Sequence, residues 1–235
     1  VMGAFASHII FGWEGKKKWQ ECGMLSVCRK HQGIFEMGCQ GPDLFLYNPA
    51  MLFSTYDKNL GERMHVEKCG RFMACLADVI RQQEEKEAVE VGLSYLMGLL
   101  AHYTLDTSLH PYVYARTGYD PADPYAPKAT MGIHFRLEAA IDANLIAQKL
   151  GIMPNAFYPE KTMHAEKKEK ISVAEMIAQS VSCCYHLNLK KEAVLDSMFM
   201  MQHIVPQFFD RTGRRKKYLS KFEFPIWEDG LFSNL

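Results

Sequence analysis

The stretch AVEVGLSYLMGLLAHYTLDTSLH, residues 88–110, is the longest apolar segment with helical spacing in this chain. Within it, His102, Asp106 and His110 follow one another at intervals of four residues. Because residues four apart lie on one face of a helix, these two imidazoles and the carboxylate are expected to point the same way. The surrounding leucines put the row in or beside a buried face, where an unpaired carboxylate costs several kcal/mol. The stretch therefore predicts a buried helix that presents metal-ligand side chains.

A second pair with the same spacing, His134 and Glu138, lies in the next segment of helical pattern. Nitrogen and oxygen donors in this mixture suit zinc or a similar first-row metal. A single histidine on an apolar helix is more often a hydrogen-bonded core residue, but the joint pattern favours metal ligation. These two motifs hold five donors, more than the four that one tetrahedral zinc takes, so they predict more than one ion.

Helical periodicity dominates the whole chain, and strand-like alternation is nearly absent. Gly33 and residues 38–43 are interpreted as interruptions, Pro111 as a helix stop, and residues 111–131 as a long functional loop. We predict an all-α fold, in which residues 1–235 form a single multi-helix domain with metal ligands contributed by several helices. The expected helices cover residues 8–30, 61–83, 88–109, 132–150, 172–187 and 190–209.

Composition excludes some classes of partner. The 235 residues carry 27 basic and 27 acidic side chains, so no global field attracts a polyanion and nucleic acid is not expected as a partner. No apolar run approaches the roughly 20 residues of a membrane span, so no transmembrane segment is expected. The first residues lack a basic region followed by a long apolar one. No signal peptide is visible, and a cytoplasmic location is predicted.

The cysteines are odd in number and include no C-x-x-C pair: Cys22, Cys28, Cys39, Cys69, Cys75, Cys183 and Cys184. Cys183 and Cys184 are adjacent, which is a poor geometry for a mutual bridge. We therefore expect reduced, partly buried thiols in a reducing compartment rather than a disulfide framework.

Three residues upstream of the long helix are further candidate ligands. His8 and His65 stand at expected helix starts, and Asp43 follows Gly41-Pro42 in a predicted turn. Each has an ordinary explanation on its own, as a helix cap or a turn residue. Beside a metal cluster, each also supplies a donor of the right type.

The order His8, Gly-Pro-Asp43, His65, H-x3-D, His110 and H-x3-E resembles the zinc-dependent phospholipase C family, which is related to the fungal single-strand nucleases. The resemblance covers roughly residues 6–140. It implies an all-α fold with a trinuclear zinc site that hydrolyses phosphodiesters. By this resemblance, the expected ligand sets are Asp43, His65, His102 and Asp106 for one zinc, His110, His134 and Glu138 for a second, and His8 with bridging Asp106 for the third.

In secreted members of that family, an N-terminal tryptophan completes the third zinc site, whereas this sequence begins Val1-Met2-Gly3. The cofactor is therefore expected to be zinc, with two or three ions per chain. Metals of this kind offset charge on the phosphate and activate a water, which Asp43, the catalytic candidate, could orient as well as ligate. Aromatic side chains could line the cleft, touch lipid or simply pack: Tyr47, Phe53, Tyr56, Tyr112, Tyr114, Tyr119 and Tyr125.

The function expected from this pattern is a metal-dependent, phospholipase C-like hydrolase of a small-molecule or lipid phosphodiester, with peripheral membrane contact as an option. One alternative is a phosphoesterase or nuclease-like enzyme that acts on nucleotides or another soluble phosphoester. Another is a non-catalytic metal-binding helical protein. Open coordination positions would favour an enzyme, and closed tetrahedral sites would favour the non-catalytic protein.

Overall fold

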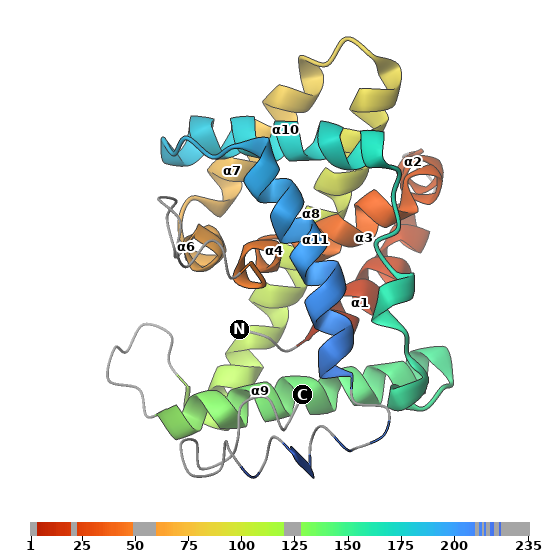
Figure 1. The fold of residues 1–235 in the computed structure, drawn as a ribbon, viewed down its shortest axis with the longest axis vertical. Coiled ribbons are helices and arrows are strands. Elements are labelled where there is room, and N and C mark those ends of the chain that lie inside the picture. Colours follow the sequence, from red (N-terminus) through yellow and green to blue (C-terminus); the bar gives the residue numbers. More distant parts are fainter. Residues whose placement is uncertain are drawn as a thin grey trace.

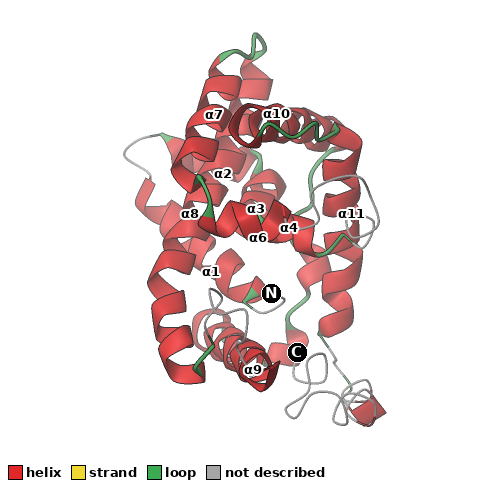
Figure 2. Cartoon of the chain, turned by 90° about the vertical axis from the view of Figure 1, so that its left-hand side faces the viewer, coloured by secondary structure: helices red, strands yellow, loops and turns green. Residues whose placement is uncertain are grey.

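The computed structural model describes residues 4–19, 23–48, 60–119 and 128–209, and isolated positions between 212 and 221. Every regular element in these ranges is a helix and none is a strand (Figures 1 and 2). The prediction of an all-α fold is therefore confirmed. None of the described helices combines the length and the apolar character needed to cross a membrane.

Long helices frame the molecule. In Figure 1, α10 crosses the upper end, α9 crosses the lower end, and α11 runs between them. The elements in chain order are α1 (Phe5–Lys16), the 3-10 turn η1 (Lys17–Trp19), α2 (Met24–Lys30), α3 (Gln32–Gln40), α4 (Asp43–Leu46), α6 (Leu60–Val66), α7 (Cys69–Arg81), α8 (Lys86–Thr117), α9 (Lys128–Leu145), the π-helical turn η2 (Ile146–Leu150), the 3-10 turns η3 (Pro154–Ala156) and η4 (Pro159–Lys161), α10 (Lys167–Tyr185) and α11 (Lys191–Phe208).

The central element is α8, which packs against α1, α2, α3, α7, α9 and α10. Its buried residues Val91, Tyr95 and Leu99 join the main hydrophobic cluster. Each fully buried side chain of this size contributes roughly 1.5–3 kcal/mol relative to exposure. His102 is only 1% exposed, so the row of candidate ligands begins inside the core, as its leucine-rich surroundings predict.

Two glycines allow α3 and α8 to cross with their backbones in contact. A Cβ atom on Gly38 would lie 2.2 Å from the carbonyl oxygen of Tyr95, and one on Gly98 would lie 2.1 Å from that of Phe35. The prediction that Gly33 and Gly38 interrupt a helix is wrong, because both lie within α3. Gly38 serves helix packing instead, and the chain turns only at Gly41, where φ is +49°.

The prediction that Pro111 stops the long helix is also wrong. The helix α8 continues to Thr117 with Pro111 inside it and ends at Gly118, whose φ is +66°. Proline removes one backbone hydrogen bond and disfavours the helix. Its own ring is exposed, while Val113 and Thr117 are buried beyond it, so tertiary packing holds the last turns.

Other helix boundaries differ from the sequence prediction in smaller ways. The expected helix over 8–30 is divided into α1, η1 and α2, with residues 20–22 outside the described chain. The expected helix over 61–83 is broken before α7 at Lys68, whose φ is +56°. The helix expected over 172–187 starts earlier, at Lys167, where Glu166 and Glu169 form a capping box.

Candidate metal centre

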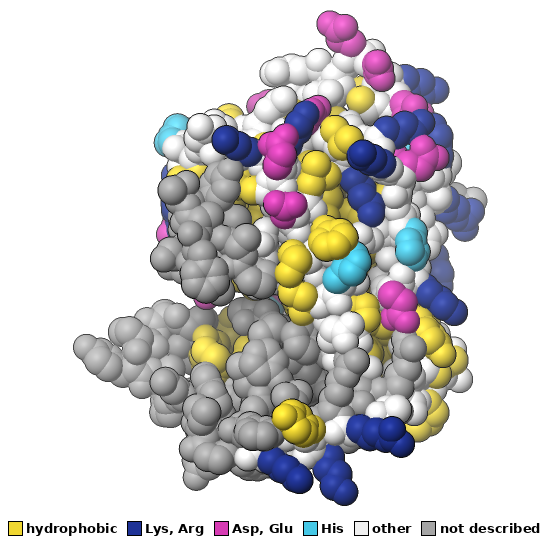
Figure 3. Space-filling view, viewed as in Figure 1, with side chains coloured by type: hydrophobic (Ala, Val, Ile, Leu, Met, Phe, Trp, Pro, Cys, Tyr) yellow, Lys and Arg dark blue, Asp and Glu magenta, His cyan; other side chains and the backbone are white. Residues whose placement is uncertain are grey.

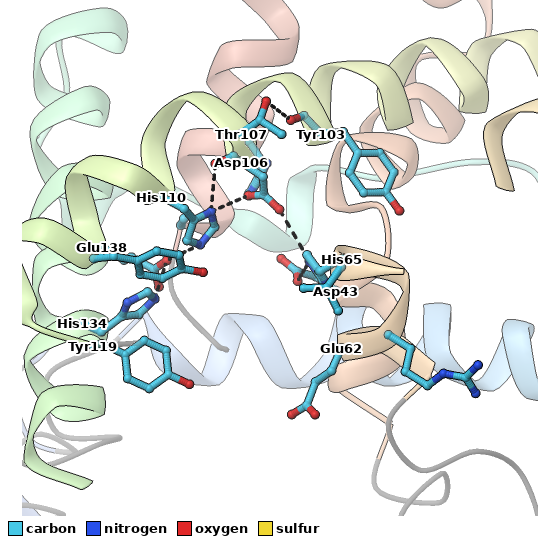
Figure 4. A pocket seen from close by; sticks show the side chains of 15 residues that line it. Asp43, Glu62, His65, Tyr103, Asp106, Thr107, His110, Tyr119, His134 and Glu138 are labelled. Carbon is cyan, nitrogen blue, oxygen red and sulfur yellow. Dashed lines mark hydrogen bonds and ion pairs between the residues drawn. The ribbon is translucent and has the colours of Figure 1, made fainter. Parts of the chain in front are cut away.

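The eight predicted ligands come from five helices and converge on one region. Figure 4 labels six of them, namely Asp43, His65, Asp106, His110, His134 and Glu138. The helix α8 supplies three of them, α9 supplies two, and α1, α4 and α6 supply one each. All except His102 line a cavity of about 450 Å³. Their donor atoms fall into groups that could each hold a metal ion: His8, Asp43 and His102; His65, His102 and Asp106; and His110, His134 and Glu138.

Asp106 lies at the middle of this arrangement (Figure 4). Its Oδ1 atom is 3.3 Å from His8 Nε2 and 3.4 Å from His110 Nδ1. Its Oδ2 atom is 3.2 Å from His102 Nε2 and 3.6 Å from His65 Nε2. One carboxylate therefore faces four imidazoles, two on each oxygen.

On one side of Asp106, Asp43 and His65 form a close pair, with 3.1 Å between Asp43 Oδ1 and His65 Nε2. Asp43 is the first residue of α4 and His65 the sixth of seven residues in α6, so the expectation that His65 begins a helix is wrong. The turn before Asp43 needs glycine at Gly41, because a Cβ atom there would lie 2.7 Å from the ring of His102. The Gly-Pro-Asp motif thus brings the backbone of the turn against an imidazole of α8.

On the other side of Asp106, Glu138 joins the ligands of α8 to those of α9. Its Oε1 atom lies 3.0 Å from His134 Nε2 and 3.5 Å from His110 Nε2. His110 reaches this group from within α8, and the rings of His110 and His134 stack with centroids 5.9 Å apart. His110 therefore faces α9 from within α8, one residue before Pro111.

Hydrogen bonds to backbone carbonyl groups orient three of the imidazoles. His102 Nδ1 lies 3.1 Å from the carbonyl oxygen of Cys39, and His65 Nδ1 lies 2.7 Å from that of Gly61. His110 Nδ1 lies 3.1 Å from the carbonyl oxygen of Asp106 in the preceding turn. An N–H donated from Nδ1 in this way leaves Nε2 as the lone-pair nitrogen, which is a common orientation for a metal-binding histidine.

Burial and charge act in opposite directions on the carboxylates. Burial alone would raise the pKa of Asp106, but His102 and His8 hold it well below its usual range. Burial likewise opposes ionisation of Glu138, yet hydrogen bonds with His110 and His134 lower its pKa to about 2. Both groups are therefore ionised at neutral pH and present negative oxygens to the centre.

The imidazoles respond differently to the same surroundings. Burial lowers the pKa of His102, which favours the neutral ring that a metal ion binds. Burial acts the same way on His65, but the hydrogen bond with Asp43 and the charges of Asp43 and Asp106 outweigh it and raise its pKa to about 9. In the metal-free protein, His65 thus acts as a cation between two carboxylates.

These residues fit a zinc centre by two criteria. Five imidazoles and three carboxylates form the nitrogen and oxygen donor set that zinc accepts. In addition, buried atoms of the centre lack a hydrogen-bond partner among the described residues, including His8 Nδ1, His134 Nδ1 and Glu138 Oε2. Buried polar atoms without a partner are rare and costly, and a bound cation would satisfy the carboxylate oxygen.

Sequence reasoning missed Asp142, which continues the spacing of His134 and Glu138 by one more helical turn. It is 8% exposed and does not join the metal groups. Its oxygens accept hydrogen bonds from the backbone N–H of Ala6 at 2.9 Å, the N–H of Ser7 at 2.8 Å and the Ser7 hydroxyl. Asp142 therefore fastens the first turn of α1, which carries His8, to α9.

The cavity also contains part of the predicted aromatic lining. Tyr114 and Tyr119 line it, and the ring of Tyr119 lies 5.0 Å from that of His134. Tyr47 is buried in the core and Tyr112 is 53% exposed, so neither is part of the lining. Phe53, Tyr56 and Tyr125 lie outside the described residues, as do Val1, Met2 and Gly3. Glu62 and Arg63 of α6, which sequence reasoning did not single out, also line the cavity.

Over the described residues, an all-helical fold with adjoining groups of imidazole and carboxylate donors is the arrangement expected of a helical protein that can bind metal ions. A family model described as zinc dependent phospholipase C matches residues 4–185. The match spans more than half of the chain, and the chain belongs to this family. The resemblance inferred from the motifs is thereby confirmed. Neither the curated proteins nor the solved structures searched contain a match.

Proposed function

We propose that the chain is a zinc-dependent phosphodiester hydrolase that uses two or three zinc ions, with the eight predicted ligands as their donors. The observation that carries the proposal is the position of Asp106, whose Oδ1 atom faces Nε2 of His8 and whose Oδ2 atom faces Nε2 of His102 and His65. A carboxylate in that position has the geometry of a bridge between neighbouring cations. The cavity beside it gives a substrate access to the same atoms.

The chemistry divides between the cofactor and the chain. Zinc, when bound, supplies Lewis-acid charge for the phosphate oxygens and lowers the pKa of water. Asp43 accepts a hydrogen bond from the attacking water and orients it, because its carboxylate lines the cavity and is paired with His65. Burial opposes ionisation of Asp43, but the pKa falls below its usual value through the hydrogen bond and charge of His65. The ionised carboxylate therefore remains able to accept that hydrogen bond at neutral pH.

The proposed substrate class is a small-molecule or lipid phosphodiester. A cavity of about 450 Å³ admits a phosphoryl headgroup, and Tyr114 and Tyr119 offer apolar ring faces. Nucleic acid is disfavoured, since basic and acidic side chains are interspersed over the upper part of the face in Figure 3 rather than gathered by sign. Peripheral membrane contact and a cytoplasmic location stay predictions.

A panel of substrates tests this function directly. The zinc-loaded protein is incubated with a chromogenic phosphodiester, phospholipid vesicles, a single-stranded oligonucleotide and a phosphomonoester, and released products are measured. Hydrolysis of the first two at the highest kcat/KM is expected. Preference for the oligonucleotide or the phosphomonoester would favour the alternative phosphoesterase, and no turnover of any substrate by protein of verified zinc content would favour a non-catalytic metal protein.

The variant Asp106→Asn links turnover to the proposed centre. It keeps the shape of the side chain but removes the charge shared by four imidazoles. We expect it to lose at least one zinc and at least about 100-fold in kcat, with helix content unchanged. Asp196→Asn, an exposed change on α11, is the matched control and should retain both. Near wild-type turnover by Asp106→Asn would place the catalytic centre elsewhere.

A further inference from the structure

Two cysteine side chains from neighbouring helices face each other away from the metal centre. Cys75 lies on α7 and Cys183 on α10, helices that pack against one another. Their Sγ atoms are 2.7 Å apart. A disulfide holds its sulfurs about 2.05 Å apart, so closing the bond requires an approach of only about 0.7 Å. The two thiols are therefore already placed for a covalent bond.

The neighbouring cysteines point elsewhere, so the pairing is specific. Cys184 follows Cys183 in α10 but is fully buried, and its thiol faces the backbone carbonyl of Lys68 at 3.9 Å. The thiol of Cys69 faces the carbonyl oxygens of Met64 and His65, each at 3.3 Å. Successive residues of a helix point about 100° apart, which explains why one member of the adjacent pair meets α7 and the other does not.

We propose that Cys75 and Cys183 form a reversible disulfide, with a low-molecular-weight disulfide such as oxidised glutathione as the oxidant. Cys183 is the exposed member and reacts first. Its thiolate attacks the oxidant, forms a mixed disulfide and releases one glutathione thiolate. The Cys75 sulfur then loses its proton, attacks the Cys183 sulfur and displaces the second glutathione. Two protein thiols are oxidised in this exchange while one glutathione disulfide is reduced to two thiols.

The bond would fasten α7 to α10 across a long segment of chain, because residues 75 to 183 include the whole of α8 and α9. Closing a long loop restricts the unfolded chain more than the folded one, which stabilises the protein. The same end of α10 already supports the connection between α6 and α7, where the hydroxyl of Tyr185 donates to the carbonyl of Glu67 at 2.8 Å. The disulfide would therefore further restrain the connection between α7 and α6, the helix that carries His65.

The test compares zinc-loaded full-length protein held in reduced glutathione with the same protein equilibrated with oxidised glutathione. Free thiols are blocked with iodoacetamide, and peptides are mapped by mass spectrometry without reduction. We expect a cross-linked Cys75–Cys183 peptide, the loss of two reactive thiols, and a rise in Tm of about 5–10 °C. Zinc content should be the same in both samples.

Two variants separate this bond from other thiol chemistry. Cys183→Ser, at an exposed position, should abolish both the cross-link and the rise in Tm. Cys184→Ala, the matched neighbour, should retain both, whatever its own starting Tm. The proposal is overturned if oxidised protein carries only a glutathione adduct on Cys183 with Cys75 still alkylated. A cross-link that uses Cys184 or Cys69 instead would overturn it equally.

Discussion

At the scale of single residues, the centre depends on ionised carboxylates held among buried imidazoles. Glu138 is 1% exposed, and an unpaired charge at that depth would cost several kcal/mol. His110 and His134 offset part of that cost, while one of its oxygens has no partner among the described residues. Neighbouring imidazoles likewise offset the cost of burying the charge of Asp106. A bound cation would offset the part of this cost that remains in the metal-free protein.

Zinc uptake by the metal-free protein should release a proton from His65. Its pKa of about 9 means that the ring is charged at pH 7, whereas zinc binds the neutral ring. Because the folded pKa is raised, this pair stabilises the metal-free fold below about pH 6.5 and loses that effect as pH rises through about 9. Titration calorimetry at pH 7 in buffers of different ionisation heat measures the proton. Wild-type protein should release about one more proton than His65→Gln, and equal release by both would contradict this assignment.

The variant Asp142→Ala should loosen the start of α1. It removes a buried acceptor of two backbone N–H groups and one hydroxyl. We expect a loss of about 1–3 kcal/mol in the free energy of unfolding of metal-free protein, measured in urea. Zinc binding through His8 should weaken as well. Asp196→Asn serves as the control, and an unchanged urea midpoint for Asp142→Ala would show that this connection between helices contributes nothing.

At the scale of elements, the crossing of α3 and α8 sets the position of the ligand row. Gly98 lies one helical turn before His102, and Gly38 lies next to Cys39, whose carbonyl oxygen faces His102 Nδ1. The contact between backbones at the two glycines thus determines which carbonyl the imidazole meets. This crossing fixes the position of α8 along its own axis relative to the turn that carries Asp43.

The variant Gly98→Ala tests the importance of this crossing. Its Cβ would lie 2.1 Å from a backbone oxygen that cannot move alone, so the helices must separate. We expect destabilisation of at least about 1–3 kcal/mol in chemical denaturation. Gly70→Ala is the matched control, because nothing lies within 4 Å of its added Cβ in the first turn of α7. That variant should be neutral or more stable by about 0.5–1 kcal/mol, and equal effects of the two changes would refute the packing argument.

The sequence predicted those elements whose signals are local. The spacing of His102, Asp106 and His110 indicates one helix face, and the structure has them on one helix. The predictions at Pro111 and Gly38 are wrong because tertiary packing overrides the local preference of a residue. Burial beyond the proline stabilises the end of α8, and contact between α3 and α8 requires the glycine. No spacing rule indicates which carbonyl His102 meets. The role of Asp142 does not follow from its spacing from Glu138, because its partners lie more than 130 residues away in the sequence.

At the scale of the whole molecule, the donors connect helices from distant parts of the chain. The helices α1, α4, α6, α8 and α9 each supply at least one donor. Figure 2 shows α1 beside α8 and above α9, and it packs against both. Because metal binding to preorganised ligands adds to folding stability, ions bound at this point would add a further connection between these helices. The metal centre is therefore proposed to serve the fold as well as the reaction.

The most direct test of this account is a crystal structure of the zinc-loaded protein with anomalous diffraction recorded on both sides of the zinc absorption edge. It counts the ions and locates them in one measurement. The account predicts at least two zinc peaks in the cavity, with Asp106 touching two of them and with His110, His134 and Glu138 around one. At most one zinc per chain, or zinc ions that leave Asp106 without contact, would contradict it.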